Sequence, residues 1–468
     1  MSRDMIAVLE EVARAQDGFV ELRHVAKTTR QVAVEQGRVE RSSVSRRSGV
    51  GVRVLVDGTW GFSSTGSAEA GAIRRAVERA RAAAAASASR RQERVADLAP
   101  VGLARGEFGS ADAARVAAIP LEEKVALALE TERATRERSV LVRSAACVYN
   151  EIDEEKAIVT TDGAAAHLRL VRPEFRVQAV AERDGTLSTA NESVGVTGDW
   201  TCLFRGRSRD ELVERAARNA VDLLDAPFPE GGRATVILAP SIVGLLVHEA
   251  IGHTVEADFV MSGSVAAGKI GQRVGSELVN LCDSGASEFA DGAGGTLAVD
   301  DEGVPTRRVE IIRDGILRSY LHNRESASRF GVEPTGSARA WDYSDQPLIR
   351  MRNTYLEPGT QSLEEIIAST KDGYLLDGPR NGQADATGEF MFGVQSAIRI
   401  RNGVPGELVK GVTISGVAFE VMQTVDAVSS EFRWDLGSGY CGKGQPAKVD
   451  AGGPYIRCRA LLGGVQKG

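Results

Sequence analysis

Hydrophobic and polar positions change their spacing several times along the chain, and these changes predict a mixture of helices and strands. Residues 5–15 and 68–86 repeat apolar positions at the spacing of amphipathic helices. Alternating segments typical of strands cover residues 19–24, 29–34, 38–47, 49–56 and 59–62. Asp57-Gly58 separates the last two segments and predicts a hairpin turn. Residues 1–90 are therefore expected to form a small antiparallel sheet covered by helices.

The next part of the chain predicts a linker and a middle α/β domain. Residues 91–118 are polar, contain Pro100, and are expected to link two domains. The domain itself spans residues 119–228. Helices are predicted for residues 121–138 and 208–224, and strands of a second sheet for residues 140–149, 157–161 and 167–180.

The remaining residues, 229–468, predict a larger and mainly β C-terminal domain. A buried strand over 234–239 precedes a helix start at Pro240 and Ser241, with Ser241 as the N-cap. Further strands are predicted within 301–322, 398–404 and 409–421, and a short helix is predicted for 363–370. The whole pattern predicts a multi-domain α+β protein.

Composition excludes several classes of protein. The 57 basic and 64 acidic side chains give a net charge of −7, which argues against non-specific nucleic-acid binding. The five cysteines are scattered and form no C-x-x-C pair, as is typical of a reducing cytosol. No stretch of about 18 apolar residues predicts a membrane span, and the first residues do not resemble a signal peptide. We therefore expect a cytoplasmic protein without a membrane partner.

The most informative motif is His248-Glu249-Ala250-Ile251-Gly252-His253, which contains two of the five histidines. It is one residue longer than the His-Glu-x-x-His pattern of zinc peptidases. In a regular α-helix, residues five apart point about 140° away from each other. A single π-helical turn would bring them back onto one face, and Gly252 would ease it. The alternative is two unrelated histidines on a buried helix.

If the two histidines bind a metal, zinc is the default because imidazole suits it. A catalytic site needs a third protein ligand and one open position. The candidates are Glu256, Asp258, His322 and a cysteine, among which Cys441 stands out in a glycine-dense loop. Glu249 occupies the position of the general base in His-Glu-x-x-His enzymes.

Other polar residues allow two interpretations each. Asp385, Thr387 and Glu389 could line a substrate cleft or belong to a glycine-rich turn. Arg339, Trp341 and Tyr343 could contact a peptide or form a surface loop. His24 and His167 alternate with apolar residues and are expected to be structural.

Four segments together resemble the TldD/PmbA family of metallopeptidases, on its TldD side, and the resemblance covers nearly the whole chain. They are residues 48–62, the motif 248–253, the glycine-rich segment 381–393 and residues 441–445. The resemblance implies one Zn²⁺ per subunit, held by His248, His253 and Cys441, with Glu249 as the general base. It assigns no role to Cys458.

The same resemblance implies a peptidase that cuts short or unfolded peptides inside a dimer cavity. Leader segments of modified peptide antibiotics and destabilised antitoxin-like proteins are the implied substrates. The implied partner is a PmbA/TldE-like subunit in a heterodimer, or a second copy in a homodimer. Strand addition to a sheet edge is a hypothesis for peptide binding. Two alternatives remain: a non-catalytic peptide-binding subunit, and a metal-dependent amidase that tailors a peptidic metabolite.

Overall fold

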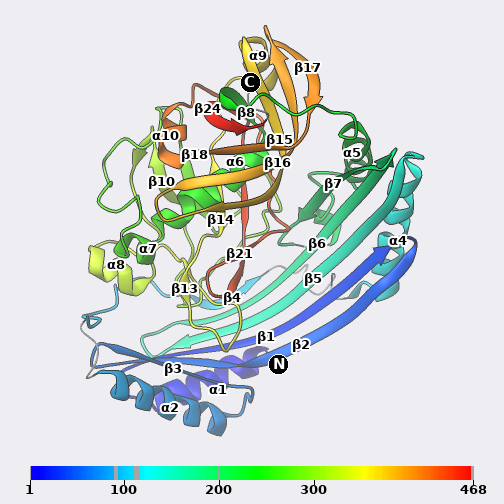
Figure 1. Ribbon diagram of the computed structural model, residues 1–468. Helices are drawn as coiled ribbons and strands as arrows, with labels where there is room; N and C mark the ends of the chain where they lie inside the picture. The colour runs from blue at the N-terminus through cyan, green and yellow to red at the C-terminus, as the bar shows by residue number, and fades with distance from the viewer. Residues whose placement is uncertain (1, 89–92, 110–115, 117, 199, 465–468) are drawn as a thin grey trace.

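The computed structural model describes residues 2–88, 93–109, 116, 118–198 and 200–464. Its first part is a single long, curved sheet of seven strands, in the order β3-β2-β1-β5-β6-β4 with β7 beside β6 (Figure 1). The strands are β1 (Phe19–Glu35), β2 (Arg38–Val56), β3 (Thr59–Thr65), β4 (Arg105–Gly109), β5 (Val142–Thr160), β6 (Ala165–Arg183) and β7 (Thr186–Gly195).

Strands expected in two separate sheets share this one sheet. β1 pairs with β2 along one edge and with β5 along the other, from Glu21 opposite Thr160 to Glu35 opposite Ala146. The alternation of β1 predicts a strand but does not reveal which neighbours it has. β4 lies within the predicted linker and pairs in parallel with β6. Residues 91–92, 110–115 and 117 of that linker lie outside the described residues.

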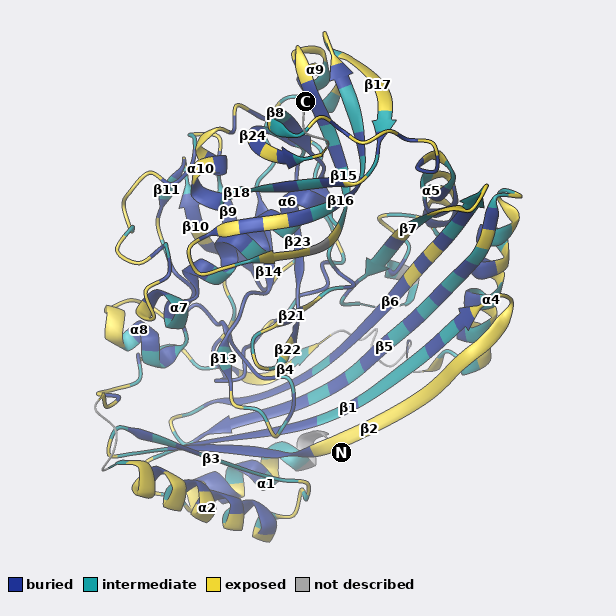
Figure 2. Cartoon of the chain, in the orientation of Figure 1, coloured by how far each residue is buried: buried dark blue, intermediate teal, exposed yellow. Residues whose placement is uncertain are grey.

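Helices cover the two ends of the long sheet. α1 (Ser2–Arg14) and α2 (Ala70–Ala88) bury an apolar layer with β1–β3 at one end. α4 (Leu121–Glu137) and α5 (Arg209–Asp222) bury a second layer against β5 and β6 at the other end. Ser208 caps α5 by accepting the backbone N–H of Glu211 at 3.1 Å, which accounts for the predicted helix start. The first half of β2 remains exposed (Figure 2).

The C-terminal part is built around a small closed β-barrel. Its strands pair in the order β15-β8-β24-β18-β16, and β16 returns to pair with β15. The barrel strands are β8 (Gly232–Leu238), β15 (Asp372–Ala384), β16 (Glu389–Arg401), β18 (Val412–Val417) and β24 (Ile456–Gly463). β17 (Val404–Val409) extends β16, and β19 (Ala427–Val428) pairs with β24.

A second C-terminal sheet lies beside the barrel, in the order β11-β10-β9-β14-β23-β20. Its strands are β9 (Leu281–Ser284), β10 (Val309–Arg313), β11 (Ile316–Leu317), β14 (Asn353–Leu356), β20 (Arg433–Trp434) and β23 (Asp450–Gly453). Two short hairpin pairs complete the strands: β12 (Ala338–Arg339) with β13 (Leu348–Ile349), and β21 (Tyr440–Gly442) with β22 (Pro446–Lys448). The short helices are α7 (Ala257–Met261), α8 (Arg324–Phe330), α9 (Leu363–Ala368) and α10 (Ala418–Gln423).

Two strand predictions in this part were too long. Within residues 301–322, only β10 and β11 form a hairpin, with Ile312 opposite Leu317 around a turn at Asp314-Gly315. Residues 418–421 belong to α10 because the chain leaves the barrel there and buries Phe419 and Met422 in the core. The helix predicted for 363–370 is present as α9 and ends two residues earlier, at Ala368.

A helix crosses the C-terminal core and positions the motif. α6 (Pro240–Leu246) begins directly after β8, with Pro240 in its first turn and Ala239 rather than Ser241 as the N-cap. The Ser241 hydroxyl instead donates to Asp377 at 3.1 Å. The apolar side chains of α6 share one core with the barrel and the second sheet. None of the described helices is long and apolar enough to cross a membrane.

Buried ion pairs attach the long sheet to the C-terminal part. Arg53 of β2 donates to both Glu21 and Glu302 at 2.6 Å, and Lys156 of β5 donates to Asp301 at 2.9 Å. All five side chains are at least nine-tenths buried, so each charge depends on its partners.

Candidate metal site

The motif forms the π-helical turn that its spacing predicts. Residues Val247–Gly252 are π-helical and continue α6 without a break. The backbone N–H of His253 donates to the carbonyl of His248, five residues earlier. This wide turn offsets the angular separation of the two histidines, so that both side chains leave the helix toward the same region.

Gly252 is required by packing, because the helix passes close to the segment before β14. A Cβ at this position would lie 2.0 Å from the Sδ of Met351. Met351 is fully buried, so a methyl group at this position would overpack the core.

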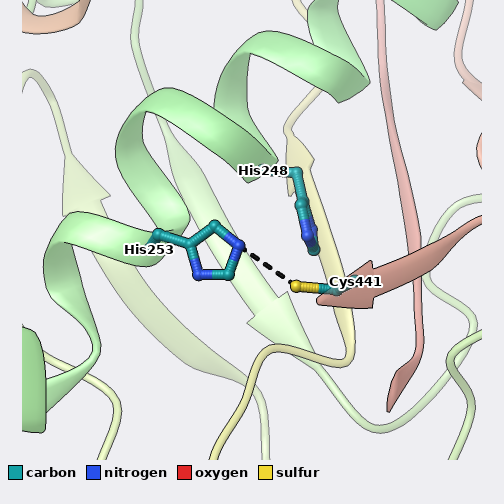
Figure 3. A group of neighbouring side chains, drawn as sticks. All are labelled: His248, His253 and Cys441. Atoms are coloured by element: carbon teal, nitrogen blue, oxygen red, sulfur yellow. Dashed lines mark hydrogen bonds between the residues drawn. The ribbon is translucent and has the colours of Figure 1, made fainter. Parts of the chain in front are cut away.

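The structure brings His248, His253 and Cys441 together (Figure 3). One ligand atom from each lies within 4.8 Å of the other two, and His253 Nε2 is 3.1 Å from Cys441 Sγ. Cys441 comes from β21, whose pairing with β22 fixes the backbone beside the π-helix. His248 is 2% exposed, and neither of its ring nitrogens has a hydrogen-bond partner in the described structure. A buried imidazole without a partner is costly unless a cation or ligand satisfies it.

The electrostatics of this cluster favour a thiolate. Burial alone would raise the pKa of the Cys441 thiol, but the positive charges of His248 and His253 outweigh it and lower that pKa to about 5. Burial lowers the pKa of His253, whereas Cys441 and Glu256 raise it to about 10. Two imidazoles and a thiolate are ligands that suit zinc, and as three ligands they leave one position open.

Glu249 lies at the rim of the cluster. Its side chain is 34% exposed, and its carboxylate is 3.8 Å from His253 Nε2. It lines a cavity of about 860 Å³ together with His248 and Cys441, and a smaller one of about 280 Å³ together with His253. The larger cavity lies between β5–β7 of the long sheet and the C-terminal part. Glu249 can therefore reach both solvent and any group held by the cluster.

The carboxylates considered as third ligands have other partners. Glu256 Oε2 is 3.1 Å from His253 Nδ1 and also accepts a hydrogen bond from Lys443 Nζ at 2.8 Å. Asp258 Oδ1 accepts from the same ammonium at 2.8 Å. Glu256 therefore lies on the Nδ1 side of His253, whereas Cys441 lies on the Nε2 side. Sequence reasoning missed Lys443, although its place two residues after Cys441 could have indicated it.

The other histidines lie outside the cluster. His322 Nδ1 is 3.1 Å from the Ser326 hydroxyl, and burial lowers its pKa to about 4. His24 contacts Ser48 at 3.2 Å, and His167 contacts Glu155 at 3.0 Å.

The remaining cysteines also lie outside the cluster. Cys147, Cys202, Cys282 and Cys458 form no disulfide among the described residues and are not part of the cluster with the two motif histidines. Cys458 sits in the barrel core on β24, where burial raises its pKa to about 12. Cys458 therefore contributes to the packing of the barrel core.

Asp385, Thr387 and Glu389 form the tight turn between β15 and β16. Asp385 Oδ1 accepts hydrogen bonds from the backbone N–H groups of Thr387 and Glu389 and from the Thr387 hydroxyl. Asp385 also lines the 280 Å³ cavity beside Glu249 and His253. All three residues lie at this turn. Asp385 and Glu389 also line a cavity of about 1070 Å³, and Asp385 lies next to the cluster, so a role in substrate binding stays a prediction.

The segment with Arg339, Trp341 and Tyr343 is not a surface loop. Arg339 is buried and donates to the carbonyl of Met351 at 2.6 Å. The Trp341 ring lies 3.5 Å from Lys27 Nζ of β1, and Tyr343 packs closely on Gly49 of β2. Trp341 and Tyr343 therefore dock the C-terminal part onto the long sheet.

Three family descriptions match most of the chain. Residues 20–84 match PmbA/TldA metallopeptidase domain 1, residues 115–224 match the central domain, and residues 231–462 match the C-terminal domain. The last of these contains the whole His248, His253 and Cys441 cluster.

Similar proteins carry related names. A metalloprotease of Methanothermobacter thermautotrophicus is 34% identical over 455 residues, which cover 96% of each chain. A metalloprotease TldD homologue of Haemophilus influenzae is 36% identical, over 74% of this chain and 73% of its own length. A zinc metalloprotease TldD homologue of Saccharolobus solfataricus is 33% identical over 67% of each chain.

Solved structures share the fold. TldE from Thermococcus kodakarensis has a TM-score of 0.80 at 19% identity and covers 99% of both chains. A putative modulator of a DNA gyrase from Thermotoga maritima has a TM-score of 0.81, also at 19% identity, over 99% of this chain and 100% of its own. With three matched domains and relatives above 30% identity over most of its length, the chain belongs to the PmbA/TldD family of metallopeptidases.

Proposed function

We propose that this protein is a zinc-dependent peptidase that hydrolyses short or unfolded peptides, with His248, His253 and Cys441 as the metal ligands. The observation that carries the proposal is the convergence of these three side chains from a π-helical turn and a distant hairpin. The unpartnered, buried nitrogens of His248 add to it, because a metal would supply the partner they lack. The zinc named in the Saccharolobus solfataricus relative supports this choice of metal.

Glu249 is the proposed general base. Bound zinc would lower the pKa of the attacking water and polarise the peptide carbonyl. The Glu249 carboxylate, at the rim of the cluster, would accept a proton from the attacking water and pass it to the departing amine. Its side chain is 34% exposed, and it lies farther from His253, at 3.8 Å, than Glu256 does, at 3.1 Å.

The cavity indicates the form of the substrate. The cavity of about 860 Å³ is bounded by the long sheet and by residues next to Cys441, and it would accommodate an extended or unfolded peptide segment. Strand addition would bind such a segment through its main chain. A TldE-like subunit or a second copy would enclose the cavity further, and the shared fold with TldE supports an assembly of this kind.

Metal content tests the proposal. Elemental analysis should find close to one zinc per purified wild-type chain, and sharply less in His253→Ala and in Cys441→Ser. Cys458→Ser is the matched control, because this thiol lies in the barrel core, and it should keep the metal. Zinc retained by Cys441→Ser would reject the ligand set. A metal-free wild type would instead favour a peptide-binding subunit.

Cleavage of the same protein in folded and unfolded form tests the proposed preference for unfolded substrates. Metal-loaded protein, alone and with a TldE-like subunit, would be incubated with a small protein in folded form and in a permanently unfolded variant. Cleavage of the unfolded form alone is expected. Equal cleavage of both forms would contradict restricted entry.

A further inference from the structure

We infer that Lys443, acting through Glu256, is a positioning residue for the His253 imidazole. This inference rests on the proposed metal site and concerns the residues that hold its ligand His253 in place. The chain of contacts runs from Lys443 Nζ to Glu256 Oε2 at 2.8 Å, and from the same oxygen to His253 Nδ1 at 3.1 Å.

The Glu256 contact selects which nitrogen of His253 faces Cys441. A carboxylate only accepts hydrogen bonds, so Nδ1 of His253 must carry the proton that it donates to Glu256. When His253 is neutral, its Nε2 then presents a lone pair toward Cys441, 3.1 Å away. A carboxylate behind a ligating histidine fixes the ring orientation and strengthens it as a ligand.

Lys443 in turn holds Glu256 in place. Its ammonium group donates to Glu256, to Asp258 at 2.8 Å and to the carbonyl of Ile349 at 3.0 Å, so three acceptors surround its three N–H groups. The Phe259 ring lies 4.3 Å from the same nitrogen. Glu256 is fully buried, and Lys443 is the cation that neutralises it without competing for the cluster.

The position of Lys443 in the chain couples two ligand segments. Lys443 follows Cys441 by two residues, whereas Glu256 follows His253 by three. The ion pair therefore ties the turn after β21 to the end of the π-helix, 187 positions apart in the sequence. Loss of the pair would release both His253 and Cys441 from their shared orientation.

Zinc affinity of the full-length protein tests the inference. The affinity would be measured by competition with a chromophoric chelator for wild type, Lys443→Met, Glu256→Gln and the double variant. We expect Lys443→Met to weaken zinc binding by about 10-fold or more, as for other residues behind metal ligands. In the Glu256→Gln background the same change should have a much smaller effect, because the two residues act through one path. The control is Lys371→Met, an exposed lysine before β15, which should bind zinc like wild type.

A second readout separates positioning from general support of the fold. Cobalt-substituted protein should show an altered visible absorption spectrum in Lys443→Met and a spectrum closer to wild type in Lys443→Arg, which keeps the charge. A lysine that only stabilised the loop would lower the melting temperature of the metal-free protein and leave the cobalt spectrum unchanged, which would overturn the inference. If Lys443→Met does not fold, the double variant, which leaves no unpaired charge at Glu256, and Lys443→Arg supply the comparison.

Two further results would contradict the inference in different ways. Unchanged zinc affinity in Lys443→Met would show that the lysine does not act on the site. If Lys443→Met weakened zinc binding equally in the wild-type and in the Glu256→Gln backgrounds, Lys443 would not act through Glu256. A wild type that binds no zinc would instead remove the proposed function itself, and the wild-type titration shows this directly.

Discussion

The Nε2 atom of His253 lies 3.1 Å from the Sγ atom of Cys441, although the two residues are 188 positions apart in the sequence. One comes from a helix in the C-terminal core and the other from a short hairpin. Each thereby shifts the pKa of the other, in the directions that favour a thiolate and an imidazolium. A metal entering the site would displace the imidazolium proton and retain the thiolate.

Replacing Glu249 with glutamine should separate metal binding from catalysis. Glutamine has nearly the same shape but cannot accept the proton, so peptide hydrolysis should fall by a factor of about 10² to 10⁴. Zinc content should stay at the wild-type level. Steady-state kinetics and elemental analysis on the same preparation check both points. Glu277→Gln, an exposed glutamate on the surface, is the control and should retain full activity.

Gly252→Ala should destabilise the protein despite the better helix propensity of alanine. The new methyl group would overlap the Met351 sulfur, and overpacking of this kind costs about 1–3 kcal/mol of unfolding free energy. Chemical denaturation measures this loss. Gly71→Ala on α2 is the matched control, because its methyl group would meet only the end of the Arg75 side chain, at 3.7 Å. A Gly252→Ala protein as stable as wild type would contradict the packing described for the π-helix.

His322 should make the protein less stable as the pH falls. Burial lowers its folded-state pKa to about 4, below the value of about 6.5 expected in the unfolded chain. Between these values the unfolded state binds the proton more readily, so stability present above pH 6.5 is lost as the pH approaches 4. The contribution of this residue is at most about 3 kcal/mol.

The His322→Gln variant provides the comparison. Denaturation curves at pH 7.5, 6, 5 and 4 should show a smaller decline for the variant than for the wild type. An equal fall in stability of both proteins would mean that His322 has the same pKa in the folded and unfolded states. That result would be contrary to its burial beside Tyr320 and Phe330.

Arg352→Ala should be strongly destabilising. The Arg352 guanidinium donates to Asp283 at 2.7 Å, and neither side chain is exposed. Removal of one partner leaves a buried carboxylate unpaired, which costs about 3–5 kcal/mol. Thermal and chemical unfolding of the variant and the wild type would measure this loss of stability. The control is Arg14→Ala, which breaks a pair at the protein surface and should cost less than about 1 kcal/mol.

Much of the local structure could be predicted from the sequence, because it depends on nearby residues. The spacing of His248 and His253 predicted the π-helical turn, and Ser208 indicated the start of α5. The Asp57-Gly58 pair marked a turn at which both residues have positive φ. Such signals depend on backbone geometry within a few positions.

Contacts between distant segments could not be predicted in this way. The residues alone left Cys441, Glu256 and Asp258 as competing third ligands, because nothing in their spacing shows that Lys443 occupies both carboxylates. The resemblance singled out Cys441, and the geometry places it beside both histidines. The pairing of β1 with β5 was missed for the same reason, since an alternating strand is compatible with many neighbours.

The pairing of β1 with β5 affects how the chain folds during its synthesis. On the ribosome, β1 emerges with β2 and β3, but the strand that protects its other edge, β5, begins only at residue 142. Until then the nascent hairpin presents an open row of backbone donors and acceptors, to which another nascent chain could anneal. Nascent chains of this protein should therefore need a ribosome-associated holdase during synthesis. The need should be greater than for a protein whose first sheet is completed within its first hundred residues.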